Sequence, residues 1–341
     1  MHNQIVSSWS ADQDWLYAID GSSLGKPIAW TASTDTWQEW VDTSNGPAVI
    51  TGGYTPGTVG LTFSNGATLP LHGGQVDTSS DHKYGAVVTR TRMKRLVHPV
   101  GDVNDPSEHQ PSAATDPITL WDFHVSGGPH WLSTIHLPSF GLPSAARKGE
   151  LQNISFSPDD KYVAVLVQVE FGTGPKLVGK TFIFATGSGK LVGSAPYGNG
   201  MLWSSDSKSL WLGTPMPEGQ GTDRIVNVQG QTVWTWPDSM TRNMVLPISS
   251  DTLLVVDHRR LGVWNKHTGL KSFSRLGELQ GGAVGQMAPG GTGAMVDLWG
   301  SVVYVKWGSG GSTDSGRNRS QQICYYYVNR AHHASRRCEP G

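Results

Sequence analysis

Apolar and polar positions alternate in short runs along most of the chain. Residues 154–157 alternate apolar with polar side chains, whereas residues 163–167 are continuously apolar. The first pattern is typical of a β-strand with one covered face, and the second of a strand covered on both faces. Long amphipathic helical patterns are missing from the sequence. We therefore predict an all-β fold.

A short phrase of Ser or Pro with Asp recurs before strand-like runs. It is clearest before the runs that begin near Trp15, Tyr162 and Leu210. The positions of these turns, weaker copies included, are Asp12, Asn45, Asp81, Asp159, Asp206, Asp251 and Gly290. Apart from the long step between Asp81 and Asp159, their spacing is near the period of about 40 to 45 residues expected of propeller blades. The repeat predicts a ring of similar units, each with its turn before a second strand.

A second series of apolar strands alternates with these turns. Its members occupy residues 27–30, 59–63, 118–122, 181–184, 224–227, 261–264 and 302–305. Glycine-containing turns follow several of them, at residues 126–128, 187–189, 229–230 and 267–269. Such turns are typical of tight hairpins that need positive φ, here between a third and a fourth strand. Both series give seven units, which predicts a seven-bladed β-propeller of four-stranded antiparallel blades.

Two local patterns resemble a known repeat family. Trp121 and Asp122 end one third strand, and Trp264 and Asn265 end another, while residues 157–159 read Ser-Pro-Asp. On these residues the units resemble the repeats of the WD40 family and of the looser WD40-like, YVTN-type propellers, over about residues 4–307. The Gly-His pair that usually opens a WD40 repeat is not found before the first strands. The resemblance implies the propeller fold.

Large aromatic residues recur at predicted strand positions. We expect these tryptophans to fill the wedges between blades, where each buries a large apolar area. They are Trp30, Trp121, Trp203, Trp211, Trp234, Trp264 and Trp299. Trp37 and Trp40 are less regularly placed and are candidates for exposure.

Composition narrows the classes of partner. The chain has 341 residues, 43 Gly, 16% charged residues and a formal net charge of -1. A near-neutral chain lacks the basic footprint that nucleic-acid binding normally needs. No apolar run has the length of a membrane span, and the N-terminus has no apolar core of the kind that a secretion signal requires. We expect a single, monomeric, cytoplasmic propeller domain over residues 1–328 that binds neither nucleic acid, membrane nor cofactor.

One segment interrupts the repeat and predicts a binding surface. Residues 91–117 carry charges, histidines and prolines without a strand pattern, so we interpret them as an insertion between the second and third strands of the third unit. Loops at 138–150, 171–176 and 214–222 emerge on the same face in a propeller. Binding residues concentrate on long loops held by a rigid scaffold, although such loops are also tolerated without a function. The candidate partner-binding residues are Arg92, Lys94, Arg95, His98, His109, Phe140, Arg147, Phe171, Lys176, Met216 and Glu218.

The end of the chain contains a further strand pattern. Residues 308–316 are rich in Gly and Ser, and residues 322–328 then read as a strand that completes the last unit. We expect the basic residues 329–341 to form a disordered tail. The only two cysteines, Cys324 and Cys338, form no metal-binding pair of the Cys-x-x-Cys type, and whether they form a disulfide is left open.

Three enzyme-like signals have simpler explanations. Residues 21–25 match Gly-x-Ser-x-Gly, but a strand follows where a nucleophile turn requires a helix. The phrase around Ser204 and Asp206 resembles the Asp-box of sialidase propellers, yet it precedes a second strand instead of joining the third and fourth. The histidines at positions 98, 109, 124, 130 and 136 lack the short fixed spacings typical of metal ligands, so surface imidazoles are favoured over a metal site.

Two classes of function remain, and one question about the chain's extent. The first is a non-enzymatic, WD40-like platform for protein partners, bound on the loop-rich face of the third to fifth units. The alternative is a propeller enzyme of the hydrolase or lactonase type, with acids and histidines meeting at the mouth of the central channel. Ionisable side chains that converge there with shifted pKa values would favour the enzyme. The chain is also interpretable as the sensor portion of a larger multidomain protein.

Overall fold

The described residues form β-strands and no helix. The computed structural model describes residues 5–10, 13–18, 28–29, 36–53, 60–63, 68–70, 75–79, 81–88, 117–138, 150–171, 176–196, 198, 201–213, 223–235, 244–257, 260–275, 284–287, 293–297, 301–306, 322–329 and 334–340. These strands make seven antiparallel sheets, here numbered first to seventh in chain order, in which neighbouring strands follow one another in sequence. The all-β class predicted from the sequence is confirmed.

The first four sheets are as follows. The first contains β1 (Ile5–Ser10), β2 (Gln13–Ala18) and β3 (Ile28–Ala29). The second contains β4 (Thr36–Thr43), β5 (Gly46–Gly53), β6 (Gly60–Phe63) and β7 (Thr68–Pro70). The third contains β8 (Gln75–Thr78), β9 (Tyr84–Val88), β10 (Ile118–Asp122) and β11 (His130–Ile135). The fourth contains β12 (Glu150–Phe156), β13 (Tyr162–Phe171), β14 (Lys176–Ala185) and β15 (Leu191–Pro196).

The remaining three sheets follow the same order. The fifth contains β16 (Met201–Trp203), β17 (Ser209–Leu212), β18 (Arg224–Asn227) and β19 (Thr232–Thr235). The sixth contains β20 (Met244–Ser249), β21 (Thr252–Asp257), β22 (Arg260–Asn265) and β23 (Gly269–Arg275). The seventh contains β24 (Val284–Met287), β25 (Gly293–Asp297), β26 (Ser301–Lys306), β27 (Gln322–Asn329) and β28 (Ala334–Pro340).

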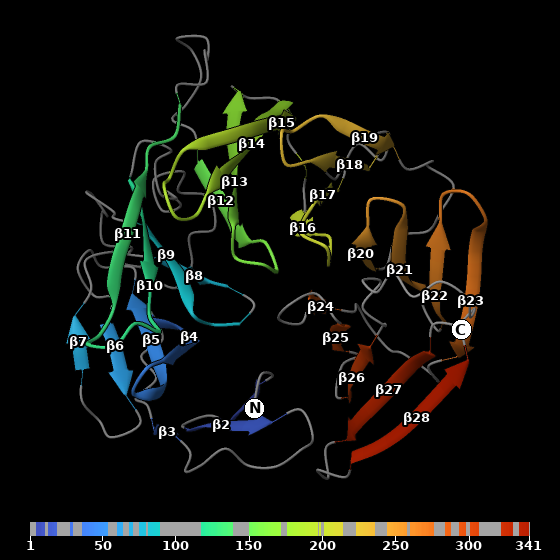
Figure 1. The fold of residues 1–341 in the computed structure, drawn as a ribbon, viewed down its shortest axis with the longest axis horizontal. Helices are drawn as coiled ribbons and strands as arrows, with labels where there is room; N and C mark the ends of the chain where they lie inside the picture. The colour runs from blue at the N-terminus through green and yellow to red at the C-terminus, as the bar shows by residue number, and fades with distance from the viewer. Residues whose placement is uncertain are drawn as a thin grey trace, which may run out of the picture.

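The sheets lie side by side around a ring, so the fold is a β-propeller (Figure 1). The first strand of most sheets lies toward the middle of the ring and the last strand toward its outside. Both repeat series are in register with this architecture. Each predicted turn falls between the first and second strands of a sheet, and each apolar strand of the second series overlaps a third strand.

The two ends of the chain depart from the regular four-stranded pattern. Three strands are described in the first sheet and five in the seventh. β27 pairs with β26, as predicted for residues 322–328. The prediction of a disordered tail over residues 329–341 is corrected, because β28 pairs with β27 from Ala334 to Pro340. Backbone hydrogen bonding to an existing sheet edge orders a basic segment that composition alone predicts to be disordered.

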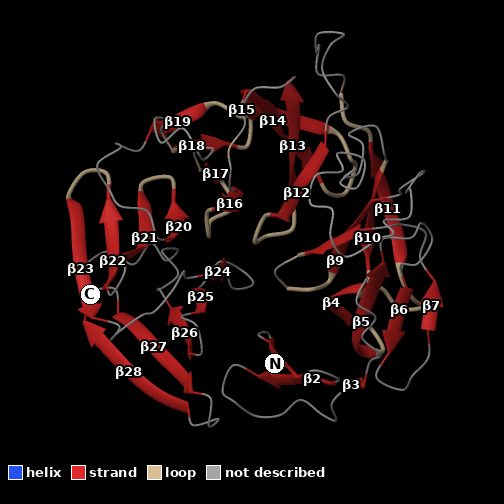
Figure 2. Cartoon of the chain, turned by 180° about the vertical axis from the view of Figure 1, so that it is seen from behind, coloured by secondary structure: helices blue, strands red, loops and turns tan. Residues whose placement is uncertain are grey.

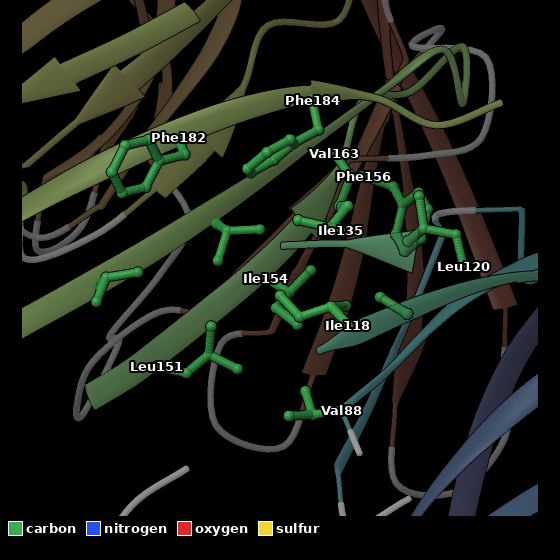
Figure 3. Packing of buried hydrophobic residues seen from close by; sticks show 13 residues of the cluster. Val88, Ile118, Leu120, Ile135, Leu151, Ile154, Phe156, Val163, Phe182 and Phe184 are labelled. Atoms are coloured by element: carbon green, nitrogen blue, oxygen red, sulfur yellow. The ribbon is translucent and has the colours of Figure 1, made fainter. Parts of the chain in front are cut away.

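The hydrophobic core is divided into clusters between neighbouring sheets. The cluster between the third and fourth sheets includes Ile118, Leu120, Ile154, Val165 and Phe184, all buried (Figure 3). Similar clusters join the second to the third sheet, the fourth to the fifth and the fifth to the sixth. The third, fourth and fifth sheets are thus buried on both faces by their neighbours, which explains the continuously apolar second strand of the fourth.

Several of the predicted wedge tryptophans belong to these clusters. Trp203 and Trp264 are buried, and Trp121, Trp211 and Trp234 are partly buried against the same clusters. The rings of Trp234 and Trp264 stack with centroids 4.5 Å apart. Trp30 and Trp299 lie outside the described residues, and the side chains of Trp37 and Trp40 on β4 are not described. These five tryptophans therefore pack between sheets, as predicted.

Tight turns between third and fourth strands also follow the sequence. Gly127, Gly128, Gly189 and Gly230 have positive φ, as predicted. At Gly230 an added Cβ would lie 2.1 Å from the carbonyl oxygen of Ser194 on β15. The turn of the fifth sheet therefore approaches the outer strand of the fourth so closely that only glycine fits there.

Candidate functional site

Three turns between first and second strands have the same structure. These Ser-Asp turns are residues 79–83, 157–161 and 204–208, and their loops at β8–β9 and β12–β13 extend toward the middle of the ring (Figure 2). In each, the serine hydroxyl donates to Oδ1 of the aspartate two residues later, over 2.8 Å from Ser79, 2.8 Å from Ser157 and 2.6 Å from Ser204. The same hydroxyl accepts a backbone N–H at the start of the second strand, at 3.0 Å in every turn. Paired serine and aspartate side chains thus close each hairpin.

The aspartate of each turn has a further structural task. Its Oδ1 accepts the backbone N–H of the lysine that ends the turn, at 3.0 Å for Asp81, 3.2 Å for Asp159 and 3.1 Å for Asp206. The ammonium group of Lys83 lies 2.9 Å from Oδ2 of Asp81, and that of Lys161 lies 3.0 Å from Oδ2 of Asp159. The carboxylates of Asp81 and Asp159 are therefore bound to backbone and lysine groups of their own turns.

The residue after each aspartate has left-handed backbone geometry without being glycine. His82, Asp160 and Ser207 have φ values of 61°, 59° and 59°. Positive φ is uncommon for residues with a side chain, although His and Asp adopt it more readily than most. In each turn the N–H of this residue donates to the serine carbonyl at 2.9 Å. The strained position is therefore fixed by the turn and recurs in three consecutive sheets.

This left-handed residue touches the preceding sheet in all three turns. The carbonyl of His82 accepts the N–H of Asp42 on β4 at 2.7 Å, and Oγ of Ser207 accepts the N–H of Asp159 at 3.0 Å. Asp160 lies close enough to Asp81 of the third sheet for the charge of Asp81 to act on its carboxyl group. The fifth sheet continues the series, because the N–H of Ser205 donates to the carbonyl of Pro247 on β20 at 3.1 Å. A line of contacts between turns thus joins the second sheet to the sixth on one face.

The Asp81 and Asp160 pair has opposite pKa shifts. Burial, together with the negative charge of Asp81, raises the pKa of Asp160 to about 8. Burial also acts to raise the pKa of Asp81, but hydrogen bonds from Lys83 and Ser79 outweigh it and lower that pKa. Two adjacent carboxyl groups do not both ionise readily, so Asp160 is the one that holds its proton near neutral pH. Its Oδ1 is buried and has no hydrogen-bond partner.

Among the described residues, the Asp81 and Asp160 pair is the candidate for acid–base chemistry. A carboxylic acid that stays protonated near pH 7 is able to donate a proton, as a general acid must. Within the described ranges, no group of three or more His, Cys, Asp or Glu side chains has the arrangement of a metal site. The described residues also contain no helix that is long and apolar enough to cross a membrane.

The strand ends that flank the predicted partner-binding loops lie at the edge opposite the Ser-Asp turns. Strands alternate in direction within each sheet, so this holds for the described ends on either side of 89–116, 139–149, 172–175 and 214–222. Phe171 and Lys176 are strand residues and face each other as the last pair of β13 and β14. The other candidate residues, namely Arg92, Lys94, Arg95, His98, His109, Phe140, Arg147, Met216 and Glu218, lie outside the described residues.

The histidines do not gather at one point within the described residues. Nδ1 of His124 lies 3.3 Å from Oδ2 of Asp42. His130 and His136 are exposed at the start of β11 and just after its end. His98 and His109, like the Gly-x-Ser-x-Gly match at 21–25, lie outside the described residues. The Asp-box resemblance at Ser204 and Asp206 is one of the Ser-Asp turns, between a first and a second strand as expected.

The sequence did not single out Asp160. In the sequence Asp160 is the second of two adjacent aspartates, after Asp159. The equivalent positions of the other two turns are His82 and Ser207. Alignment of the three turns reveals an acid at that position only in the fourth sheet. The partner, Asp81, belongs to another sheet, and no pattern local to either turn predicts their contact.

The chain is similar to known proteins in structure. No family model and no curated protein matches the chain. Hsv2p of Kluyveromyces lactis is similar with 10% identity, a TM-score of 0.47, and coverage of 80% of this chain and 82% of that one. The β-propeller domain of the Trilobed protease from Pyrococcus furiosus has 10% identity, a TM-score of 0.46, and coverage of 91% and 96%. The periplasmic gluconolactonase of Pseudomonas aeruginosa has 14% identity, a TM-score of 0.40, and coverage of 98% of both chains. At such identities the likeness concerns the fold.

Proposed function

We propose that this propeller is a rigid platform for protein partners, which bind on the face formed by the connections of the third, fourth and fifth sheets. The single observation that carries the proposal is topological. Four connections, at 89–116, 139–149, 172–175 and 214–222, leave one edge of three consecutive sheets, while the line of contacts between Ser-Asp turns joins those sheets at the other edge.

Rigidity of the scaffold is the first support for this function. Core clusters fill the space between the third and fourth sheets and between the fourth and fifth. Hydrogen bonds add direct contacts, because Ser133 donates to the carbonyl of Thr186 at 3.0 Å and Trp203 donates to the carbonyl of Ser155 at 2.9 Å. Loops supported on a rigid frame lose less conformational entropy on binding than the same loops on a mobile one.

The second support for a platform function is the length and the charge of the longest connection, residues 89–116. The segment 89–116 contains Arg92, Lys94 and Arg95 close together, with His98 and His109 beyond them. A basic cluster within an otherwise near-neutral chain favours a partner with an acidic surface, and it raises the rate of encounter with that partner. The proposed partner is therefore a protein with an acidic patch.

Affinity capture with matched baits tests this proposal. The baits are the unchanged chain, a deletion of 91–117, the triple change Arg92→Glu, Lys94→Glu and Arg95→Glu, and Lys190→Glu as a control. Lys190 is exposed and lies between β14 and β15, on the face opposite the loops. Bound proteins are quantified by mass spectrometry, and each candidate is then tested by calorimetry with purified components.

We expect acidic partners that are lost from both loop variants and retained by Lys190→Glu. Thermal unfolding of each bait shows whether the propeller is intact, so a loss of binding is separable from a loss of fold. Identical sets of captured proteins on all four baits, or partners lost only with Lys190→Glu, would contradict the loop face as the binding surface.

The carboxyl pair favours a second candidate function, a hydrolase or lactonase with its site at the Ser-Asp turns. Asp160, with its pKa of about 8, is suited to protonate a leaving group near neutral pH. The competing interpretation is structural, because Asp81 is already bound to Ser79 and Lys83. A panel of lactones and esters assayed with the unchanged chain and with Asp160→Asn separates the two. Hydrolysis that is lost in Asp160→Asn while thermal stability is kept would establish the enzyme and displace the platform.

A further inference from the structure

The chain's only two cysteines occupy directly opposed positions on its last two strands. Cys324 of β27 pairs with Cys338 of β28 in the antiparallel register of the seventh sheet. Their neighbours confirm that the register is continuous, because Ile323 pairs with Glu339 and Tyr325 with Arg337. We propose that Cys324 and Cys338 form a cross-strand disulfide that fastens the final hairpin of the propeller.

Backbone geometry alone makes this pairing feasible. Directly opposed residues of an antiparallel pair have Cα atoms about 4.5 to 5.5 Å apart and occupy the same face of the sheet. Disulfides form between residues whose Cα atoms are about 4.4 to 6.8 Å apart. A shift of one residue in either strand would place the two cysteines on opposite faces. The register therefore meets the spatial requirement that spacing in the sequence leaves open.

The bond has a structural use at this place in the fold. β28 is the outermost strand of the seventh sheet and pairs only with β27 among the described strands. An edge strand held on one side is prone to open and to pair with other chains. A covalent link within the hairpin keeps β28 in its register and closes residues 325–337 into a small loop, which lowers the entropy of the opened state.

Formation of the bond needs an oxidant, which in a cell is a disulfide-bearing oxidoreductase or oxidised glutathione. With oxidised glutathione, one cysteine thiolate attacks a glutathione sulfur, forms a mixed disulfide and releases one glutathione thiolate. The second cysteine thiolate then attacks the bound cysteine sulfur, forms the Cys324–Cys338 bond and releases the second glutathione. The two thiol protons end on the two glutathiones. Such bonds persist in oxidising compartments, so this proposal conflicts with the cytoplasmic location expected from the sequence.

The test starts from the fully reduced full-length chain in glutathione buffers of graded oxidised-to-reduced ratio. Free thiols are trapped by alkylation, and the disulfide is located by mass spectrometry of unreduced peptides. The matched control is the double change Cys338→Ser with Arg337→Cys, which moves one cysteine by one register position to face Tyr325. A second control is the unchanged chain unfolded in urea, in which the register is lost.

We expect the folded chain to form the intramolecular bond at a glutathione ratio at least tenfold less oxidising than either control requires. The peptide map needs no variant, so the proposal stays testable if the double variant does not fold. Alkylation of both cysteines in the folded, oxidised sample would overturn the proposal. So would equal oxidation of the register-shifted variant, or a bond that joins two chains.

Discussion

Asp160 of the fourth sheet lies beside Asp81 of the third, and the negative charge of Asp81 adds to burial in raising the pKa of Asp160. The two residues are equivalent in neither sequence nor role. Asp81 holds its own turn closed as an ionised carboxylate, whereas Asp160 is the left-handed residue of the next turn and keeps the proton. Protonation of Asp160 is therefore part of the contact between two sheets.

The first prediction concerns stability against pH. The pKa of Asp160 is about 8 in the folded chain against 3.8 for a free aspartate side chain, so the folded chain holds a proton that the unfolded chain releases over that window. Because the unfolded state binds fewer protons there, the free energy of unfolding falls as pH rises from about 4 to 8, by at most about 1.4 kcal/mol per pH unit. Partial access of water to Asp160 makes the slope smaller. Urea unfolding midpoints between pH 5 and 9 measure it.

Replacement Asp160→Asn isolates this term. The amide resembles the protonated acid and does not ionise, so the downward slope between pH 5 and 8 is expected to disappear and the variant to exceed the unchanged chain in stability at pH 8. The carboxylates of Asp81 and Asp159 have lowered pKa values, and they cost stability only below about pH 4, where they take up protons. Equal slopes in the variant and the unchanged chain would show that Asp160 is ionised in the fold.

The second prediction compares two tryptophans. Trp264 is 7% exposed and stacks on Trp234, whereas Trp131 is 54% exposed on an outer strand. Trp264→Ala leaves a cavity between the fifth and sixth sheets and is expected to lower the free energy of unfolding by about 3 to 5 kcal/mol. Trp131→Ala loses at most a cross-strand contact with Trp121, worth up to about 1 kcal/mol. Urea denaturation followed by circular dichroism measures both changes. Similar losses in the two variants would contradict the placement of Trp264 in the interior.

The third prediction concerns the Ser-Asp turns. Ser204→Ala removes the hydroxyl that donates to the exposed Asp206 and accepts the N–H of the buried Ser209. A buried N–H left without its partner costs about 1 to 3 kcal/mol. The control Ser188→Ala removes an exposed hydroxyl with one contact of 3.4 Å and should change stability by less than about 0.5 kcal/mol. Hydrogen exchange at Ser209 is expected to speed up in the first variant and not in the second.

Much of the fold is predictable because its signals are local. A Ser-Asp turn satisfies its own backbone within six residues, from Ser157 to Tyr162, and so leaves a readable phrase wherever it occurs. The Gly127 and Gly189 hairpins are equally local, since positive φ selects glycine at the turn itself. Repetition of these short-range signals in the third, fourth and fifth sheets marks the propeller. The WD40-like Trp121 and Asp122 pattern also falls at the end of a third strand, as expected.

The candidate site was less predictable because it depends on contacts between sheets. Asp81 and Asp160 are far apart in the sequence, and only the lateral packing of the third and fourth sheets brings them together. β28 escaped prediction for a similar reason, since its basic composition indicates disorder and its order comes from pairing with β27. Trp131 on β11 is exposed, although Trp121, its cross-strand partner on β10, packs against a core cluster. Amino-acid composition and the spacing of the repeats do not predict which neighbouring sheet or strand covers a given strand.

The last prediction tests how closely neighbouring sheets interlock at the outer edge. The turn between β18 and β19 contains Gly230, with a φ of 81°, and an added Cβ there would lie 2.1 Å from the carbonyl oxygen of Ser194 in the fourth sheet. Gly127 has a similar φ of 98°, but an added Cβ would meet nothing within 4 Å. Both glycines share the cost of placing a side chain at positive φ, about 1 to 2 kcal/mol, so the difference between them isolates the clash.

Gly127→Ala is therefore expected to lose about 1 to 2 kcal/mol and Gly230→Ala about 3 kcal/mol or more, because backbone atoms on either side must separate. Gly193 makes the reciprocal approach, with an added Cβ 2.3 Å from the carbonyl carbon of Gln229, so the two backbones have no room to yield by a side-chain rotation. Urea denaturation gives the free energies, and hydrogen exchange along β15 locates the strain. Equal losses in the two variants would mean that the fourth and fifth sheets separate at little cost, and the outer edge would then contribute nothing to the rigidity on which the platform depends.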